Sequence, residues 1–453
     1  MNSRSAARPV ASASLRHCSA PVQLLETRGS KFGSNTSLRV QSAYTRSAPR
    51  RPTVVALLAL TIVLAGLGGL TSFAANNSVQ GAKKDDSGLE LAAPTAILIE
   101  ARSGSVLYEK NADQLAPPAS MVKLMTAEFV FNALRQGEIK GTDQYVVSEN
   151  AWRRGGAPAG GPTMFAAIHS RVGIDDLLRG MIVDNGNDSA MVLAEGIAGN
   201  EREFAAMLTK RSRDIGLTHS SFGNSTGLSD PDNRMTVRDI ARLARHIILT
   251  YPDYYKLYNE RDFVWNKIHQ TNRNPLLNAL TTADGLSAGS TKEGGYGMAG
   301  SAVQDGLRLI AVVNGVSDPD DRVAETKKLL EWGFRNFELR TLFAADHVIG
   351  YAKVFGGDSR SVGLASHDPV GVMVQKNGGD KLIARIVYQG PVQAPVQPGQ
   401  QVGVIKVWRG GNVAVESPLY TTEAVGVGST MRRAFDGVTE LVIGLFRTGT
   451  EKL

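Results

Sequence analysis

An uncharged stretch of 18 residues, Thr53 to Leu70, separates a short leader from the rest of this 453-residue chain. Arg50 and Arg51 stand just before it, and Ser72, Phe73 and Ala74 form a small-x-small pattern just after it, which together are typical of a cleavable secretory signal. A stretch of this length also just suffices to span a bilayer, so residues 1–75 are a leader with either a signal peptide or an uncleaved anchor. In both cases the positive-inside rule places the remainder of the chain outside the cytoplasm.

The exported part of the chain has to be held together by its hydrophobic core. The one cysteine, Cys18, lies in the leader, so no intrachain disulfide can form and no cysteine-based zinc site can be built. The seven histidines lack the spacing of a metal-binding helix. The glycine pairs Gly155-Gly156 and Gly160-Gly161 do not follow a strand in the manner of a nucleotide-binding loop. The sequence therefore implies no metal and no cofactor.

The net charge of +7 is carried by the leader. Residues 1–75 hold nine Lys or Arg side chains and one acid, which leaves the remaining 378 residues with 41 basic and 42 acidic side chains. Proteins bind nucleic acids mainly through basic surfaces that neutralise phosphates. A body that is nearly neutral therefore argues against a nucleic-acid partner.

The hydrophobic patterns after the leader predict two domains. Residues 76–87 are polar and read as a linker, and residues 88–345 mix strand and helix patterns, which predicts an α/β mixed domain. Two hairpins are expected, with turns at Gly104 and Gly306. Apolar residues at helical spacing predict helices over Ser120–Leu134, Ile174–Ile182, Ser189–Ile197, Glu201–Ile215, Val237–Thr250 and Arg322–Phe334.

The composition changes after the first domain. Residues 350–425 are rich in Val and Gly, alternate in polarity and lack helical spacing, which predicts a small all-β domain. Helical spacing returns over residues 428–447, where apolar side chains share one face and charged side chains the other. This amphipathic helix either lies in a membrane interface and attaches the protein peripherally, or packs against the β domain or a partner.

The strongest chemical signal is a serine followed three residues later by a lysine, Ser120 and Lys123. This spacing places the hydroxyl and the ammonium on one face of a helix. A serine is a poor nucleophile unless a base lies beside it, and a lysine whose pKa is lowered by burial can act as that base. The spacing also occurs by chance, in which case Ser120 would be a helix cap and Lys123 a solvated side chain.

The sequence around these two residues resembles the serine D-Ala-D-Ala carboxypeptidases, which are the low-molecular-mass penicillin-binding proteins. The similar segments are Asn111–Asp113, Pro117–Thr126, Ser148–Trp152, Met181–Ala190, Asn224–Leu228, Asn272–Asn274 and Trp332–Phe334. The resemblance runs from about residue 88 to the end of the chain. It implies a penicillin-binding/serine β-lactamase-like transpeptidase fold of the α+β class, a carboxypeptidase-like catalytic domain over 88–345, then the small all-β domain and the C-terminal amphipathic helix.

Two of the motifs that define this family are altered. The family's Ser-x-Asn is Asn-Gly-Asn here, at Asn185 to Asn187, and its Lys-Thr-Gly is Ser-Ala-Gly, at Ser287 to Gly289. In the family the lost serine and lysine form a proton and electrostatic network around the nucleophile. Losing a cation beside Lys123 is expected to raise the pKa of Lys123 and make it a worse base. Losing the threonine hydroxyl at Ala288 removes a carboxylate hydrogen bond worth roughly 1.5–3 kcal/mol.

The other parts of the family's site are present. The resemblance assigns catalysis to Ser120, Lys123, Asn187 and Asn185, and substrate binding to Ser287, Ala288, Gly289, Ser290, Arg273 and Arg322. Backbone N–H groups of Ser120 and Ser290 match the oxyanion hole, which does not depend on side chains. The two arginines match positions near the substrate carboxylate, and a guanidinium suits bidentate carboxylate binding.

The resemblance implies an exported enzyme of the periplasm or cell envelope. It would remove the terminal D-Ala from peptidoglycan stem peptides through an acyl-enzyme on Ser120, which β-lactam antibiotics would also acylate. The altered motifs favour an alternative, a catalytically weak or inactive scaffold of the same family that binds cell-wall peptides. A β-lactamase is a further alternative, against which the β domain and the terminal helix both argue.

Overall fold

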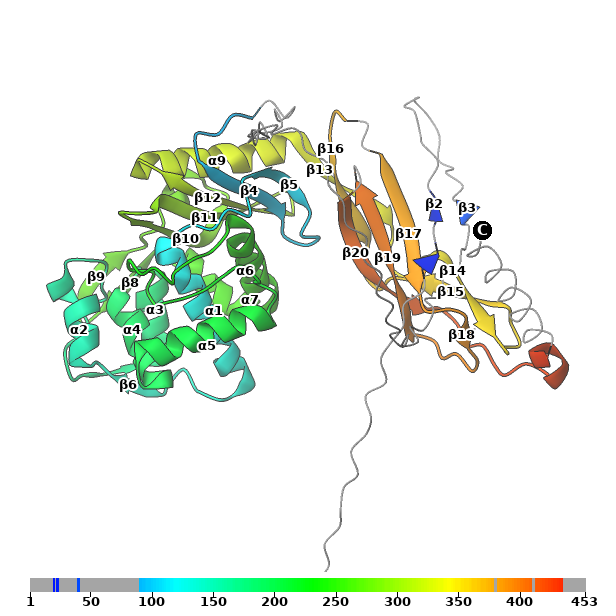
Figure 1. Ribbon diagram of the computed structural model, residues 1–453, viewed down its shortest axis with the longest axis horizontal. Helices are drawn as coiled ribbons and strands as arrows, with labels where there is room; N and C mark the ends of the chain where they lie inside the picture. The colour runs from blue at the N-terminus through cyan, green and yellow to red at the C-terminus, as the bar shows by residue number, and fades with distance from the viewer. Residues whose placement is uncertain are drawn as a thin grey trace, which may run out of the picture.

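The computed structural model describes residues 89–378, 381–409 and 412–434, together with three short strands near the N-terminus, β1 (Ser19–Ala20), β2 (Val22–Gln23) and β3 (Arg39–Val40). The apolar stretch of the leader, the expected linker over 76–87 and most of the expected helix over 428–447 lie outside the described residues. Within the described part, no helix is both long and apolar enough to cross a membrane. The described residues form a mixed α/β body followed by an all-β body (Figure 1).

A five-stranded antiparallel sheet lies at the centre of the first body. Its strands are β4 (Thr95–Glu100), β5 (Val106–Lys110), β10 (Ala283–Thr291), β11 (Gly295–Gln304) and β12 (Leu307–Val316). Their order is β10-β11-β12-β4-β5, so two hairpins from distant parts of the sequence meet where Leu98 pairs with Ala311. Strand β10 is an edge strand of this sheet, with one side left unpaired by other strands.

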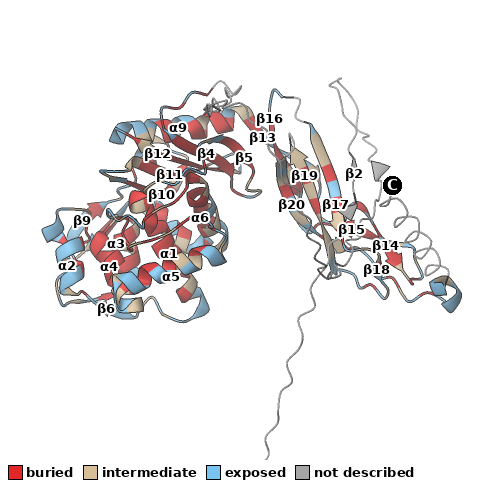
Figure 2. Ribbon diagram, in the orientation of Figure 1, coloured by how far each residue is buried: buried red, intermediate tan, exposed pale blue. Residues whose placement is uncertain are grey.

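Apolar side chains cover both faces of the sheet, and alternation along each strand separates them into two cores. In β12, Ile310 and Val312 point into the larger core with helices α1 (Val122–Gln136) and α6 (Val237–Thr250). Leu309, Ala311 and Val313 of the same strand point to the opposite face, where α9 (Pro319–Asn336) packs. Figure 2 shows this buried sheet between α9 and the remaining helices. Burial on both faces explains why β4 and β12 are almost continuously hydrophobic in sequence.

The larger core is completed by helices and short strands that lie on the side of the sheet opposite α9. The helices are α2 (Glu149–Gly155), α3 (Ile174–Ile182), α4 (Asn187–Ala198), α5 (Glu201–Asp214) and α7 (Pro252–Tyr255), and the 3₁₀ turns are η1 (Ala119–Met121), η2 (Ala157–Ala159) and η3 (Lys256–Asn259). The short helix α8 (Leu276–Ala279) lies on the other face of the sheet, where its leucines share a core with α9. Two short hairpins pair β6 (Gln144–Val146) with β7 (Arg171–Gly173), and β8 (Asp262–Trp265) with β9 (Ile268–Thr271).

The second body consists of strands packed around a core rich in valine and isoleucine. Its strands are β13 (Phe337–Phe343), β14 (Val348–Phe355), β15 (Ser361–Ala365), β16 (Val370–Gln375), β17 (Leu382–Tyr388), β18 (Val392–Gln393), β19 (Gln401–Arg409) and β20 (Asn412–Thr421). The main sheet has the order β1-β17-β19-β20-β15-β14-β18, and β13 pairs with β16 in a second sheet.

A few polar contacts join the two bodies. Arg409 on β19 donates from Nη2 to the carbonyl oxygen of Val106 at 2.8 Å, and a second bond, from Nη1 to the Met373 carbonyl oxygen at 2.7 Å, holds its guanidinium within the β body. Ser105, in the turn before β5, donates to the carbonyl oxygen of Ala414 at 2.7 Å. The turn between β4 and β5 is therefore the part of the first body that contacts the β19–β20 hairpin.

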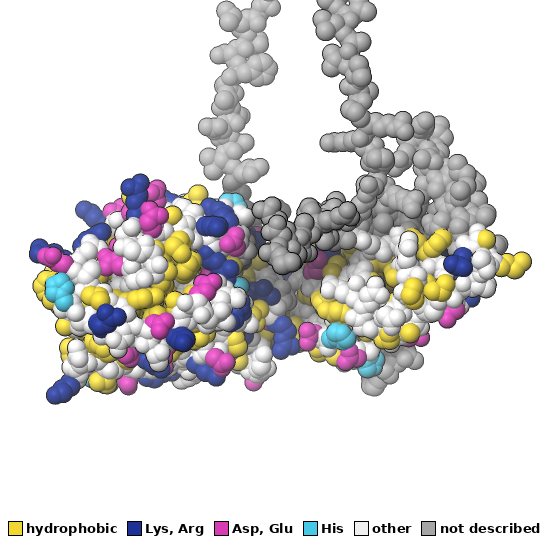
Figure 3. Space-filling model, turned by 90° about the horizontal axis from the view of Figure 1, so that it is seen from below, with side chains coloured by type: hydrophobic (Ala, Val, Ile, Leu, Met, Phe, Trp, Pro, Cys, Tyr) yellow, Lys and Arg dark blue, Asp and Glu magenta, His cyan; other side chains and the backbone are white. Residues whose placement is uncertain are grey.

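The fold class predicted from the sequence is confirmed, with a mixed α/β part followed by an all-β part. The helices expected over Ile174–Ile182 and Val237–Thr250 are α3 and α6 with the same bounds. The helix expected to start at Ser120 begins instead as the 3₁₀ turn η1 and becomes α-helical at Val122. On the face shown in Figure 3, basic and acidic side chains are mixed over the α/β body, in agreement with its nearly neutral charge.

Candidate active site

Ser120 lies in the 3₁₀ turn η1, where the chain enters helix α1. The backbone of Ala119 just before it is left-handed, with φ of 51°. Two glycines make room for this turn. A Cβ on Gly289 would lie 2.5 Å from the Ser120 nitrogen, and a Cβ on Gly227 would lie 1.8 Å from the Ala119 oxygen. Strand β10 and the loop at Gly227 therefore approach the Ser120 backbone more closely than any side chain would permit.

Lys123 lies one turn further along and is buried. Its Nζ donates to the Ser120 Oγ at 3.4 Å, to the Asn187 Oδ1 at 2.7 Å and to the carbonyl oxygen of Thr226 at 3.1 Å. Burial lowers the pKa of Lys123 to about 7, although the carboxylates of Asp188 and Glu201 act in the opposite direction. Desolvation thus keeps the pKa of Lys123 near neutrality in a site whose third motif has no lysine.

The altered second motif joins α3 to α4 and contacts both catalytic candidates. Asn185 has a left-handed backbone, with φ of 55°, and its Nδ2 donates to the Ser120 Oγ at 3.3 Å and to the Ala288 carbonyl oxygen at 3.4 Å. Asn187 begins α4, where its side-chain oxygen accepts from Lys123. The structure thus brings Ser120, Lys123, Asn185 and Asn187 together. Asn185 occupies the serine position of the family motif as a hydrogen-bond donor to the nucleophile.

The third motif lies on the edge strand β10, which runs beside Ser120. Ser287 donates to the Ser120 carbonyl oxygen at 3.4 Å, and Ala288 is buried against the α9 side of the sheet. Gly289 meets Ser120 directly, while the next residue, Ser290, is exposed. The strand therefore offers backbone groups and one hydroxyl to the cleft.

The two arginines singled out from the sequence lie in different surroundings. Arg273 lines the cleft beside Ser287, and its positive charge acts against the rise in the pKa of Asp184. Arg322 belongs to α9, where its guanidinium donates to the Gly289 carbonyl oxygen at 3.2 Å and lies 5.4 Å from the Tyr296 ring centre. The structure therefore places Arg273 in the cleft and connects Arg322 to the backbone of β10.

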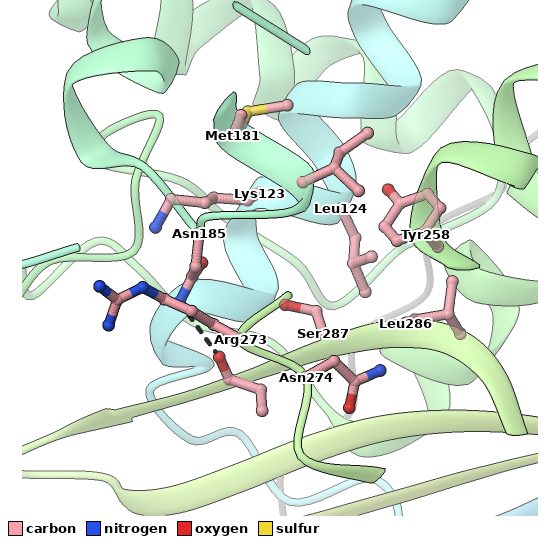
Figure 4. A pocket seen from close by; sticks show the side chains of 11 residues that line it. Lys123, Leu124, Met181, Asn185, Tyr258, Arg273, Asn274, Leu286 and Ser287 are labelled. Carbon is pink, nitrogen blue, oxygen red and sulfur yellow. Dashed lines mark hydrogen bonds between the residues drawn. The ribbon is translucent and has the colours of Figure 1, made fainter. Parts of the chain in front are cut away.

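A cleft of about 340 Å³, counting space that is open to solvent, lies between these elements. It is lined by Lys123, Leu124, Met181, Ile182, Asn185, Tyr258, Arg273, Asn274, Leu286, Ser287 and Ala288. Figure 4 shows Lys123, Asn185 and the Arg273 guanidinium on one side of the cleft and Tyr258 and Leu286 on the other. The dashed line marks the hydrogen bond from Asn185 to the Ala288 carbonyl oxygen. The polar end of this cleft is therefore next to the nucleophile.

Three functional groups were not found from the sequence. The Thr226 carbonyl is a backbone acceptor for Lys123, and no residue type signals such a contact. Asp188 is fully buried behind the second motif. Its carboxylate accepts hydrogen bonds from the Thr163 hydroxyl and from the backbone N–H groups of Met164 and Ala166. Asp184 is also buried, and burial raises its pKa to about 7. For Asp184 and Asp188, the available sequence signal was their position next to Asn185 and Asn187.

The residues assembled around Ser120 can perform nucleophilic acyl transfer. Within the described residues, no group of three or more His, Cys, Asp or Glu side chains is arranged to hold a metal ion. The nucleophile has a neighbouring amine with a pKa of about 7, an amide donor and an adjacent edge strand. An extended peptide can pair with an edge strand through its main chain.

Comparisons with known proteins give a consistent result. A family profile described as D-alanyl-D-alanine carboxypeptidase matches residues 78–318, and one described as Penicillin-binding protein 5, C-terminal domain, matches residues 337–427. The D-alanyl-D-alanine carboxypeptidase DacA of Haemophilus influenzae is 36% identical over 360 residues, which are 79% of this chain and 91% of that protein. DacC of Escherichia coli is 35% identical over 371 residues, 81% of this chain and 91% of that protein. The crystal structure of penicillin binding protein 5 from Haemophilus influenzae matches with a TM-score of 0.66 at 37% identity, covering 75% of this chain and 98% of that one.

Proposed function

The chain belongs to the D-alanyl-D-alanine carboxypeptidase family, and on that basis we propose that it removes the terminal D-Ala from peptidoglycan stem peptides through an acyl-enzyme on Ser120. The observation that carries the proposal is the buried Lys123 amine, which contacts the Ser120 hydroxyl and has a pKa of about 7. About half of such amines are neutral near pH 7, so a base is available where the nucleophile needs one.

Lys123 is proposed to move the proton in both halves of the first step. Ser120 Oγ attacks the carbonyl carbon of the penultimate D-Ala while its proton passes to Lys123 Nζ. The C–N bond then breaks, and the Lys123 ammonium returns this proton to the leaving amine of the terminal D-Ala. Water then attacks the ester carbonyl while Lys123 Nζ accepts a proton from it, and Lys123 returns this proton to Ser120 Oγ as the C–Oγ bond breaks. Backbone N–H groups of Ser120 and Ser290 would stabilise the oxyanion, as Gly289 holds β10 against Ser120.

The replacement of the second-motif serine changes the proton path. Asn185 donates an amide hydrogen to the Ser120 Oγ, and an amide neither gains nor loses a proton near neutral pH. Asn185 can therefore orient the nucleophile but cannot relay a proton to the leaving group. Lys123 is the titratable side chain within hydrogen-bond distance of the Ser120 Oγ, so the proposal assigns the transfer to it.

Carboxylate binding is proposed to depend on Arg273. With serine and alanine at positions 287 and 288, these two positions of β10 provide no cation and one hydroxyl, that of Ser287. Arg273 lines the same cleft and carries the charge that the terminal carboxylate of the substrate requires. We assign Arg322 an indirect role, since it donates to the Gly289 carbonyl oxygen and thereby supports the strand.

The site is proposed to act in the cell envelope. The leader pattern supports export, and the amphipathic pattern over residues 428–447 supports peripheral attachment to the membrane surface. Both features agree with a substrate that lies outside the cytoplasm.

The second candidate is a scaffold of the same family with little or no activity, which the changes at Asn185, Ser287 and Ala288 favour. The test is intact-mass measurement after incubation with benzylpenicillin, with Ser120→Ala as the control, together with an assay of D-Ala release from a peptide ending in D-Ala-D-Ala. A stable penicilloyl adduct that maps to Ser120, together with D-Ala release, supports the enzyme. Absence of both at long times and high drug concentration supports the scaffold, and rapid turnover of the drug would indicate a β-lactamase.

A further inference from the structure

The residue just before the second motif is an acid that the proposed mechanism does not use. Asp184 lies between the end of α3 and Asn185, and its side chain is completely buried. Its Oδ2 accepts from the Gln270 Nε2 at 2.8 Å, whereas its Oδ1 has no hydrogen-bond partner among the described residues. Burial raises the pKa of Asp184 to about 7, because a charge is poorly solvated in such a place. A carboxyl group kept at this cost beside a nucleophile is a candidate for a functional role.

The partner of Asp184 comes from the β8–β9 hairpin. Side chains alternate along β9, so Gln270 faces inward while its neighbours His269 and Thr271 are exposed. Gln270 pairs across the hairpin with Phe263, whose side chain belongs to the larger core. The inner face of the hairpin therefore carries a core residue and a glutamine, and the glutamine is bonded to Asp184.

A second hydrogen bond joins the same two segments close to the cleft. The Arg273 nitrogen donates to the Val183 carbonyl oxygen at 3.0 Å. The two donors, Gln270 and Arg273, are three residues apart, and the two acceptors are neighbours, so the bonds fix both ends of a short stretch of chain. Asn185, which comes next, donates to the nucleophile at 3.3 Å and lines the cleft together with Arg273 (Figure 4). The amide that contacts the nucleophile and the cation of the cleft are thus held by the same two residues, Val183 and Asp184.

The other contacts of this stretch do less to place it against the second motif. The Asn272 side chain donates to the carbonyl oxygens of Tyr258 and Glu260 at 3.3 and 2.7 Å, which shapes the hairpin and its ends from within. An ion pair of Arg179 with Glu260 at 3.2 Å crosses to α3, but both side chains are partly exposed, and ion pairs at a surface contribute little. The buried hydrogen bond to Asp184 is therefore the stronger polar link between the hairpin and the motif.

We propose that Asp184 is a positioning residue for the recognition of the terminal carboxylate of the substrate. Through Gln270 it holds the hairpin so that the Arg273 guanidinium lies where a carboxylate can reach it while the scissile carbonyl meets the nucleophile. Neither Asp184 nor Gln270 touches the reacting atoms, so both act through Arg273. The inference rests on the proposed function, which supplies a substrate with a free carboxylate and assigns that carboxylate to Arg273.

The test is steady-state cleavage of a peptide that ends in D-Ala-D-Ala. Asp184→Ala should raise KM about tenfold and change kcat by less than about twofold, because a displaced guanidinium weakens binding and leaves the nucleophile unaltered. Gln270→Ala removes the same bond from the other side, so it should give the same rise, and it carries the test should Asp184→Ala fold poorly. The double variant should add nothing further, since both changes break one contact. Asp184→Asn retains an oxygen that can accept from Gln270 and should restore KM.

Two further measurements show whether Asp184 acts through Arg273. In the Arg273→Ala background, Asp184→Ala should not raise KM again, because the guanidinium that it positions is absent. Phenylboronic acid, which bonds to the hydroxyl of an active-site serine and has no carboxylate, should inhibit the wild-type protein and Asp184→Ala equally. The end-point yield of the benzylpenicillin adduct counts the folded sites in each preparation, so kcat refers to competent protein.

Thr271→Ala is the matched control, because Thr271 is exposed on the same strand between Gln270 and Arg273, and it should leave KM unchanged. The inference is overturned, while the carboxypeptidase stands, by a wild-type KM in both alanine variants, by the same rise in the control, by an equal loss of boronic acid binding or by a further rise in the Arg273→Ala background. If wild-type protein released no D-Ala and formed no adduct, the proposed function itself would fall, and this is seen before any variant is compared.

Discussion

At the scale of single residues, the charge state of Lys123 controls when Ser120 can react. The amine is buried, and its pKa is lowered to about 7 mainly by desolvation. A base must be neutral to accept the Ser120 proton, so acylation is expected to rise with pH through about 7 and to level off above it. The measurement is the rate of acylation by a fluorescent penicillin between about pH 5 and 9. A rate that is flat over this interval, or that rises only near the ordinary lysine pKa, would contradict the assignment of Lys123 as the base.

The approach of Gly289 to Ser120 gives a second prediction at this scale. Because a Cβ on Gly289 would lie 2.5 Å from the Ser120 nitrogen, Gly289→Ala has to move β10 away from the nucleophile. A misplacement of about 1 Å at a reacting centre costs on the order of a hundredfold in rate, and we expect a loss of about that size in acylation by benzylpenicillin. Ser290→Ala is the matched control on the same strand, since the Ser290 side chain is exposed and its backbone N–H is retained. A large loss in the control, or none in Gly289→Ala, would show that the oxyanion site is elsewhere.

At the scale of secondary-structure elements, a buried carboxylate connects the second motif to the preceding segment. Asp188 in the first turn of α4 accepts from the Thr163 hydroxyl at 2.6 Å, from the Met164 nitrogen at 3.0 Å and from the Ala166 nitrogen at 3.1 Å. The neighbouring Asn187 nitrogen donates to the Pro162 carbonyl oxygen at 2.8 Å. The position of Asn187, and with it one acceptor of Lys123, therefore depends on the segment around residues 162–166.

Replacement of this carboxylate by an amide tests that dependence. Asp188→Asn keeps the size of the side chain, but its NH₂ group faces the donors that the carboxylate had accepted from. Loss of a buried charged acceptor lowers the free energy of unfolding by about 2–4 kcal/mol. We expect a lower midpoint in chemical denaturation and slower acylation of Ser120, both measured on the same preparation. Glu203→Gln, an exposed change on α5, is the control. Unchanged stability would mean that the segment is held by other contacts.

The longer helices and the two sheet hairpins were predictable from the sequence, whereas the short elements and the contacts in the site were only partly so. Apolar periodicity is a local property, and it gave the bounds of α3 and α6 without error. The contact of Asp188 with Thr163 joins residues 25 positions apart, and the acid reads in sequence as an ordinary residue of a helix N-terminus. The Thr226 carbonyl has no signal in residue type at all, because the acceptor is backbone.

Burial was the other quantity that the sequence could not supply. The loss of the third-motif lysine suggested a higher pKa for Lys123, because the motif shows which charges are missing but not how much water is excluded. The structure shows a buried amine, and desolvation outweighs both nearby carboxylates in lowering its pKa.

At the scale of the whole molecule, the active site belongs to one of the two bodies. The residues that line the cleft beside Ser120 lie between Lys123 and Ala288, all within the α/β body. Side-chain contacts between the bodies involve Ser105, the guanidinium of Arg409 and the ammonium of Lys376, together with Phe337 and Met373, which pack against the core beside α9. Each body also has its own hydrophobic core. Interfaces between domains of one chain generally couple them weakly unless the interface is large and hydrophobic.

Weak coupling predicts that the two bodies respond differently to acylation. An adduct that forms only in the folded α/β body raises the unfolding temperature of that body, while the β body, which contributes no residue to the cleft, is unaffected. Differential scanning calorimetry of the full chain should therefore show two transitions, of which benzylpenicillin moves one upward by a few degrees. Ser120→Ala should show neither the adduct nor the shift. If both transitions moved together, the contacts of Arg409 with the backbone at Val106 would have to transmit the stabilisation, and Arg409→Ala would then separate the two transitions again.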